Sequence, residues 1–393
     1  MPAARWSNHN CESWPELDLE LDDETQAFAA EVRDFLSANA ESIPRESYDN
    51  AEGFAQHRHW DKVLFDAGLS VINWPKKYGG RDATLLQWVV YEEEYFRAGA
   101  PGRASANGTS MLAPTLFAHG TEEQLDRVLP KMASGEEIWA QAWSEPESGS
   151  DLASLRSTAT RTDGGWLLNG QKIWSSRAPF GDRAFGLFRS DPEAQRHSGL
   201  TYFMFDLEAD GITVRPIAQL GGDTGFGEIF LDDVFVPDAD VIGQPNDGWR
   251  AAMSTSSNER GMSLRSPARF LASAERLAKL WKDYDDSTFG DQVADSWIKA
   301  QAYRLHTFGT VTRLAGGGEL GAESSVTKVF WSDLDVALHQ TALEIRGADG
   351  ELANTWTDGL LFALGGPIYA GTNEIQRNII AERLLGLPRE KSK

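Results

Sequence analysis

The hydrophobic pattern changes its period twice along the chain. Apolar residues recur at helical spacing up to about residue 135, alternate with polar residues from 137 to 243, and return to helical spacing from residue 249 onward. A period near 3.6 indicates amphipathic helices, whereas a period of two indicates strands with one buried face. The pattern predicts a multidomain α+β protein with an all-α domain at 1–136, a β domain at 137–243 and a C-terminal four-helix-bundle domain at 244–393.

The first domain carries clear helix signals. Acidic residues at 22–24 suit a helix N-terminus. Gly68 suits a left-handed stop after the next helix, and residues 85–98 continue the helical pattern. Thr121 and Gln124 form a capping box for a further helix, which we expect to end near Pro130.

The middle region contains short apolar segments separated by Asp-Gly, Asn-Gly and Gly-Gly breaks. They predict a small β-barrel or sandwich with strands at residues 185–188, 202–207, 212–217 and 228–236. Asp163-Gly164 and Asn169-Gly170 are both two-residue hairpin signals. Residues 157–162, 166–168 and 171–175 are therefore expected to form an antiparallel meander.

The third region is predicted to be a bundle of antiparallel helices, because its connections are short. Its longest helices are expected around residues 294–314 and 324–345. The glycine run at 316–321 fits a dinucleotide-binding pattern, but that pattern works only between a strand and a helix. We give it no function.

Composition narrows the classes of function. With 393 residues, 41% of them hydrophobic, the chain has material for two or three domains. A formal charge of −22 disfavours nucleic acid and anionic membranes as partners. The single cysteine, Cys11, excludes an intrachain disulfide, and the acidic leader lacks the features of a targeting peptide. These features predict a soluble cytoplasmic protein without a metal site.

A polar loop beside two indoles is the first sign of chemistry. Trp143 and Ser144 end a predicted strand, and residues 148–151 then offer small side chains and main-chain N–H groups. Trp174 and Ser176 return to the same neighbourhood. Two hydroxyls beside two indoles suit an aromatic ligand with polar edges. The alternative is that the tryptophans belong to the core and the serines to turns.

The two segments resemble the flavin-binding signature of the acyl-CoA dehydrogenases. The segment at 141–151 reads Gln-Ala-Trp-Ser-Glu-Pro-Glu-Ser-Gly-Ser-Asp, and the one at 168–176 reads Leu-Asn-Gly-Gln-Lys-Ile-Trp-Ser-Ser. The resemblance extends over nearly the whole chain. It implies an FAD enzyme that introduces a Cα–Cβ double bond into an acyl-CoA, passes electrons to an electron-transfer flavoprotein and assembles as a tetramer.

The resemblance also assigns site residues. The cofactor-binding positions would be Gln141, Trp143, Ser144, Gly149, Ser150, Trp174, Ser176, Gly371, Thr372 and Glu374. The substrate-binding positions would be Ser150, Arg260 and Tyr369.

The catalytic base is expected at an unusual place. Many relatives carry it between a tyrosine and a glycine, where this chain has Ala370. Other members carry it just before an arginine on a C-terminal helix, and Glu259 precedes Arg260 here. The resemblance therefore assigns Glu259 as the base and leaves Ala370 only its backbone N–H, which would hold the thioester carbonyl. The alternative is a surface glutamate paired with arginine.

Two departures from the family pattern affect the flavin site. Residues 287–290 read Ser-Thr-Phe-Gly, so the arginine that usually meets the flavin phosphates is missing. Residues 344–350 read Glu-Ile-Arg-Gly-Ala-Asp-Gly in place of a Gln-Ile-x-Gly-Gly-x-Gly pattern. A lost charge-assisted contact costs about 1.5 to 3 kcal/mol, so another kind of subunit could complete the site.

The sequence leaves the assembly and the substrate open. The relocated base makes the chain similar to actinobacterial members that act on bulky or steroid side-chain thioesters. Both a homotetramer and an α2β2 heterotetramer fit. The other possibilities are a non-catalytic or half-site subunit and a flavin oxidase or monooxygenase on the same scaffold.

Overall fold

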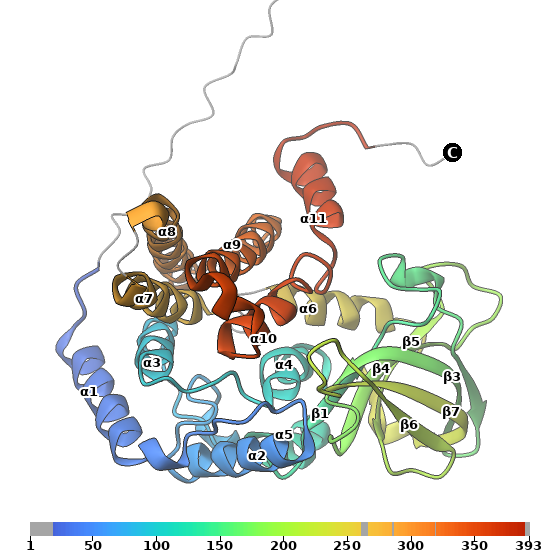
Figure 1. The fold of residues 1–393 in the computed structure, drawn as a ribbon. Coiled ribbons are helices and arrows are strands. Elements are labelled where there is room, and N and C mark those ends of the chain that lie inside the picture. The colour runs from blue at the N-terminus through green and yellow to red at the C-terminus, as the bar shows by residue number, and fades with distance from the viewer. Residues whose placement is uncertain (1–18, 261–265, 285–286, 319, 390–393) are drawn as a thin grey trace, which may run out of the picture.

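A computed structural model describes residues 19–260, 266–284, 287–318 and 320–389 of the protein, with the side chains of 257–260 excluded. Figure 1 shows helices at both ends of the chain and a strand-rich region between them. This confirms the predicted order of an N-terminal helical domain, a β domain and a C-terminal helical domain. No helix in the described ranges is long and apolar enough to cross a membrane.

The N-terminal helices begin where the capping residues predict. They are α1 (Asp23–Ala38), α2 (Ala51–Asp66), α3 (Leu85–Arg97), α4 (Ala113–His119) and α5 (Glu122–Ala133), with a π-helical turn at Asn107–Leu112 before α4. Asp22 caps α1 by accepting from the Thr25 N–H at 2.7 Å. The capping box of Thr121 and Gln124 is present in α5, which contains Pro130 and ends close to it, at Ala133.

The β domain forms one eight-stranded sheet. Its strands are β1 (Trp139–Ala142), β2 (Thr158–Thr162), β3 (Gly165–Ser176), β4 (Arg183–Arg189), β5 (Leu200–Asp206), β6 (Ile212–Ile217), β7 (Phe226–Pro237) and β8 (Val241–Ile242). The paired order is β6-β7-β3-β2-β4-β5-β8, with β1 beside β4. The two ends of this path do not pair within the fully described residues 139–242, so the sheet is not a closed barrel.

The predicted meander is only half correct. Asp163-Gly164 does join β2 to β3, with Thr162 opposite Gly165. Asn169-Gly170 makes no hairpin, because β3 continues through it and pairs with β7 across a register shift between Leu168 and Gly170. The segments predicted as two strands are therefore one strand with a bulge.

The C-terminal helices pack against each other and against the N-terminal domain. They are α6 (Gly248–Arg260), α7 (Pro267–Tyr284), α8 (Gly290–Ala315), α9 (Glu323–Arg346), α10 (Thr355–Ala363) and α11 (Asn373–Ile379). Helices α7, α8 and α9 contact one another, and α10 and α11 pack on α9. Helix α3 lies against both α7 and α8 (Figure 1), so the two helical domains share an interface.

Candidate functional site

The loop that follows β1 is held in place by a buried ion pair. The Lys172 ammonium group lies 2.8 Å from Glu145 Oε1, and the two side chains are 0% and 7% exposed. Lys172 also donates to the Leu187 carbonyl oxygen at 2.8 Å. Glu145 in turn accepts from the N–H groups of Arg156 at 2.6 Å and Ser157 at 3.0 Å. The carboxylate of Glu145, at the start of the loop, therefore binds the main chain at the end of the same loop.

The pKa values of Glu145 and Lys172 reflect both the burial of the pair and the attraction between its two charges. Burial alone would raise the pKa of Glu145, but the charge and hydrogen bond of Lys172 lower it below its ordinary value. Burial lowers the pKa of Lys172, while Glu145 opposes that shift. A buried ion pair with its remaining hydrogen bonds satisfied keeps a loop in one geometry.

The polar loop between these anchors presents small groups to solvent. Glu145 and Ser148 exchange two backbone hydrogen bonds of 2.9 and 3.0 Å, which close a tight turn. Gly149 and Ser150 beyond it are exposed. A Cβ on Gly149 would meet nothing within 4 Å, so the main chain there is open to a ligand.

The end of β3 brings the predicted hydroxyls and one indole together. The Ile173 N–H donates to the Ser144 carbonyl oxygen at 2.9 Å, so Trp174 follows directly beside Ser144. Trp174 is 57% exposed and meets the ring of Phe226 edge-on at 6.1 Å. Its φ of 58° lies in the left-handed region, which a non-glycine residue adopts only at a cost.

The same segment is tied to the N-terminal domain. Asn107 Nδ2 donates to the Ser176 carbonyl oxygen at 3.2 Å. The next residue, Arg177, forms a 3.2 Å ion pair with Asp49 and lies 3.8 Å from the centre of the Tyr48 ring. The end of β3 is therefore attached to the N-terminal domain directly beside Ser176.

Trp143 lies differently from Trp174. Its indole is 9% exposed, packs edge-on against Tyr202 and donates from Nε1 to the Tyr202 hydroxyl at 3.1 Å. The core alternative thus describes this side chain, whereas Trp174 is exposed. A flavin contact by Trp143, like that of the half-buried Gln141, stays a prediction.

The C-terminal site residues lie on the turn before α11. Ala370 has a φ of 57° and Gly371 one of 78°. Gln376 Nε2 donates to the carbonyl oxygens of both residues, at 3.2 and 3.3 Å. Thr372 caps α11 by accepting from the Ile375 N–H at 3.3 Å. Two consecutive left-handed residues point successive main-chain groups in an unusual direction, as a main-chain binding site needs.

The two predicted site residues on either side of this turn, Tyr369 and Glu374, differ in exposure: one packs in the helical core and the other lies at the surface. The Tyr369 ring stacks on Trp331 with centroids 5.9 Å apart, so it also belongs to the helical core. Glu374 is exposed in the first turn of α11, where hydrogen bonds to its own backbone N–H and to Thr372 lower its pKa. Their substrate and cofactor roles stay predictions.

The proposed base lies at the end of α6. Glu259 and Arg260 form the last turn of this helix, and their side chains fall outside the described residues. The altered segment at residues 287–290 begins with a single 3-10 turn, Ser287–Phe289, and that at 344–350 ends in another, Gly347–Glu351. Among the described side chains, no hydrogen bond or ion pair links the segment 141–176 to 365–376.

Sequence reasoning missed the buried side chains that support the site. Asn373 Oδ1 accepts from Lys328 Nζ at 2.8 Å and from Ser332 at 3.1 Å, which anchors α11 on α9. In the same way, Gln376 holds the turn at Ala370 by a hydrogen bond. The ion pair of Lys172 and Glu145 holds the loop after β1. A lysine at an inward-facing position of an alternating strand was the available signal, because it requires a buried partner.

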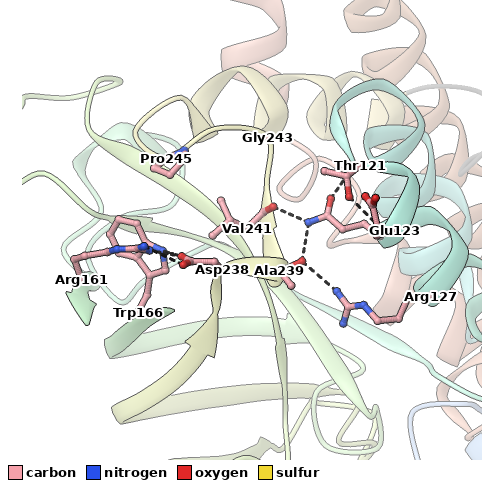
Figure 2. Close-up of a pocket in the computed structure, with 11 residues that line it drawn as sticks. Thr121, Glu123, Arg127, Arg161, Trp166, Asp238, Ala239, Val241, Gly243 and Pro245 are labelled. Atoms are coloured by element: carbon pink, nitrogen blue, oxygen red, sulfur yellow. Dashed lines mark hydrogen bonds and ion pairs between the residues drawn. The ribbon is translucent and has the colours of Figure 1, made fainter. Parts of the chain in front are cut away.

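A separate groove of about 720 Å³ lies between α5 and the β domain. Figure 2 shows Arg161, Trp166 and Asp238 on one side and Arg127 on the other. Arg161 pairs with Asp238, and Arg127 Nη2 donates to the Ala239 carbonyl oxygen at 3.1 Å. None of the predicted site residues lines this groove. Its polar groups are paired with one another and join the two domains.

The exposed and half-buried residues beside the buried ion pair fit a flavin. An accessible indole, two hydroxyl-bearing residues and an open main-chain loop are the groups needed to hold a flat ring system with polar edges. No group of three or more His, Cys, Asp or Glu side chains in the described parts is arranged to hold a metal ion. The fold is a sheet domain between two helical domains, and a flavin contact by these residues stays a prediction.

The chain belongs to the acyl-CoA dehydrogenase family. The family's N-terminal, middle and C-terminal domain models match residues 22–136, 140–234 and 246–385. Members of this family are FAD-dependent oxidoreductases, and the chain is one of them.

Relatives and solved structures agree with this membership. The acyl-CoA dehydrogenase IpdE1 of Mycolicibacterium smegmatis is 37% identical over 393 residues, covering 93% of this chain and 99% of the relative. A structure named Tcur3481-Tcur3483 steroid ACAD matches at 26% identity with a TM-score of 0.85, over 95% of this chain and 100% of that one. The ChsE4-ChsE5 complex from Mycobacterium tuberculosis matches at 26% identity with a TM-score of 0.82, over 95% of this chain and 100% of that one.

Proposed function

We propose that this chain carries out the α,β-dehydrogenation of an acyl-CoA thioester and passes the electrons to an electron-transfer flavoprotein. The supporting observation is the arrangement around Lys172 and Glu145. That ion pair fixes the loop with Gly149 and Ser150 beside the strand end with Trp174 and Ser176. FAD, when bound there, would supply the acceptor for the hydride that leaves the substrate Cβ.

The protein's own contribution is to take the proton from Cα and to stabilise the thioester. Glu259, in the last turn of α6, is the proposed base. The backbone N–H of Ala370 would donate to the thioester carbonyl oxygen, which makes the Cα proton more acidic. The bonds from Gln376 to the Ala370 and Gly371 carbonyl oxygens would hold that N–H in position.

A bulky or steroid side-chain acyl group is the proposed substrate class. The structural neighbour called a steroid ACAD supports this choice, since it matches 95% of this chain with a TM-score of 0.85. The single cysteine is compatible with a reducing compartment, and a cytoplasmic location stays a prediction.

A half-site role within a heteromeric enzyme is the second candidate. The observation in its favour is that residues 287–290 lack the arginine expected for the flavin phosphates. Two of the matched structures are named as two-component proteins, which supports an α2β2 tetramer over a homotetramer. In that case a different chain would complete the flavin site.

Anaerobic mixing of the purified enzyme with acyl-CoA esters tests the proposal. The protein is purified alone and together with any chain that co-purifies, and each is loaded with FAD. We expect flavin bleaching together with an enoyl-CoA product that is two hydrogen atoms lighter than the substrate. A flavin that binds but is not reduced by straight, branched or ring-bearing esters would refute dehydrogenation. Peroxide formed in proportion to product in air would indicate an oxidase instead.

A further inference from the structure

A series of hydrogen bonds connects one of the predicted flavin contacts to the helix that carries the proposed base. The Trp143 indole donates to the Tyr202 hydroxyl at 3.1 Å. That hydroxyl lies 3.2 Å from Thr255 Oγ1, which in turn lies 2.7 Å from Thr115 Oγ1. These four side chains form the Thr255 network, which runs from the end of β1 through β5 to α6 and α4.

The Thr255 network is buried and fully bonded. Thr115, Tyr202 and Thr255 are each 0% exposed, and Trp143 is 9% exposed. Each threonine hydroxyl also lies close to the carbonyl oxygen four residues earlier, at 2.9 and 3.2 Å, so both have an acceptor. A buried hydroxyl group is costly without partners, whereas a fully bonded network holds its members in a single arrangement. An apolar contact would lack this directional constraint.

Thr255 joins elements of all three domains. Tyr202 lies on β5 of the sheet domain, Thr115 on α4 of the N-terminal domain and Thr255 on α6, the first C-terminal helix. Helix α6 packs on both α4 and β5 (Figure 1). One residue before Thr255, Ser254 Oγ lies 2.8 Å from His119 Nε2 at the end of α4. Two adjacent hydroxyl groups thus fix α6 on its neighbours.

Position 259 continues the buried face of α6. The residues at 251, 252, 255 and 256 are all buried, which is the spacing of one helix face. Glu259 lies four residues after Thr255 in the same helix. Four residues of an α-helix advance about 6 Å along its axis and return to within about 40° of the same side. The position of Thr255 therefore sets the position of the main chain at Glu259.

We propose that Thr255 is a positioning residue, which through Tyr202 and Thr115 holds α6 where Glu259 reaches the substrate Cα. This inference rests on the proposed function, in which Glu259 takes the α-proton. A displacement of about 1 Å is enough to slow a reaction severely, because proton transfer requires hydrogen-bonding distance. Thr255 acts on the reaction through its helix, so loss of its hydroxyl should slow proton abstraction more than it weakens binding.

The rate of flavin reduction and the affinity for ligands test this role together. Both are measured on the FAD-loaded enzyme with any chain that co-purifies, anaerobically for the rate and by calorimetry for the enoyl-CoA product. Thr255→Val keeps the volume of the side chain but lacks the hydroxyl. We expect a rate about tenfold lower, with dissociation constants for FAD and the enoyl-CoA product changed by less than about twofold. A rate within about twofold of the wild type would overturn the proposal.

Thr255→Ser separates positioning from stability. Serine keeps the hydroxyl but removes a buried methyl group, so the protein should unfold at a lower urea concentration than the wild type. Its rate of flavin reduction should nevertheless stay within about twofold of the wild type. Rates that fall in step with stability in the serine and valine variants would refute positioning. Thr255→Ala, which also lacks the hydroxyl and should be equally slow, replaces the valine variant if that protein does not fold.

Thr307 of α8 provides the matched control. It is also a buried threonine, and its hydroxyl donates to the Tyr303 carbonyl oxygen of the same helix at 3.0 Å. Thr307→Val therefore removes a buried helical hydroxyl away from α6 and should keep the wild-type rate. An equal slowing by Thr307→Val and Thr255→Val would contradict a specific role of Thr255.

Combination with Glu259→Gln shows whether Thr255 acts through the base. Once the base is absent its position no longer matters, so adding Thr255→Val to Glu259→Gln should lower the rate by less than about twofold. A further tenfold loss in the double variant would overturn the proposal, because Thr255 would then act independently of Glu259.

Exchange of the Cα hydrogens gives a readout other than flavin reduction. An acyl-CoA ester with sulfur in place of Cβ has no Cβ hydride to lose, so uptake of deuterium from deuterated water at Cα reports proton abstraction alone. Thr255→Val should lower this exchange rate about tenfold as well. Exchange at the wild-type rate would overturn the positioning role.

The two proposals fail in different ways. A wild-type flavin that no ester reduces would refute dehydrogenation. A near-normal rate in Glu259→Gln would refute the assigned base and, with it, the role of Thr255. A slow Glu259→Gln beside a Thr255→Val variant at the wild-type rate would retain the proposed function and refute the positioning role alone.

Discussion

The buried ammonium group of Lys172 lies 2.8 Å from the carboxylate of Glu145, and this contact joins the two segments that carry most of the predicted flavin contacts. Lys172 belongs to β3, close to Trp174, whereas Glu145 begins the loop that contains Gly149 and Ser150. The geometry of the flavin site therefore depends on a pair that touches no ligand itself.

Breaking this pair from one side is expected to be severe. Lys172→Met leaves the Glu145 carboxylate buried without its counter-ion, so the free energy of unfolding should fall by about 3–5 kcal/mol. The double variant Lys172→Met/Glu145→Gln should lose less than the sum of the two single variants, because neither charge is then left unpaired. Urea titration of all three proteins measures this coupling.

The exposed ion pair of Arg156 and Glu147 provides the control. Its side chains are 80% and 72% exposed, so Arg156→Ala should change the free energy of unfolding by less than about 1 kcal/mol. Strict additivity of the Lys172 and Glu145 variants would contradict the coupling.

Trp174 should matter for flavin binding more than for folding. Its indole is 57% exposed, so Trp174→Leu should change the free energy of unfolding of the flavin-free protein by only about 0.5 kcal/mol. Loss of an aromatic contact with the ring system should raise the dissociation constant for FAD by about tenfold. Quenching of FAD fluorescence on binding measures that constant.

Phe235 is the matched control for this experiment, because it is also an exposed aromatic residue of the sheet, at 51%. Phe235→Ala should leave the dissociation constant for FAD unchanged. An equal loss of affinity in both variants would mean that Trp174 acts through the stability of the sheet and not through the cofactor.

Glu92 should make stability depend on pH in a defined direction. Its pKa rises from 4.5 to about 7 on folding, so between these values the folded state binds more protons than the unfolded state. The free energy of unfolding due to this group therefore falls as the pH rises through that window. Relative to the wild type, Glu92→Gln should gain roughly 1 to 3 kcal/mol between pH 5 and pH 8.

Urea titrations at several pH values, without acyl-CoA, measure this difference. Arg103 and Ser266, which lower the pKa of Glu92 against the effect of burial, are present in both proteins. Parallel stability curves for the wild type and the variant would show that Glu92 is solvated in the folded state.

The order of the three domains followed from hydrophobic period alone, but one turn signal failed for a local reason. Asn169-Gly170 is a strong hairpin dipeptide, yet Asn169 Nδ2 donates to Asp233 on β7 at 2.8 Å. A Cβ on Gly170 would lie 2.3 Å from Ser157 Oγ. The glycine is thus needed for close approach at a bulge, and the long partner strand overrides the local turn preference.

The site was predictable where it consists of contiguous motifs and unpredictable where it depends on packing. Trp143 and Trp174 looked equivalent in sequence, but only one of them is exposed. The roles of Gln376 and Asn373 depend on hydrogen bonds that no spacing rule encodes. The domain boundaries after residues 136 and 243 stay predictions.

The most direct test of the central claim is the rate of flavin reduction in Glu259→Gln under anaerobic conditions, followed by stopped-flow absorbance with an ester that bleaches the wild-type flavin. Glutamine keeps the size of the side chain but cannot accept the α-proton. We predict a rate lower by about 10² or more, with FAD still bound. A near-normal rate in this variant would contradict the assignment of Glu259 as the base of a dehydrogenation carried out by this chain.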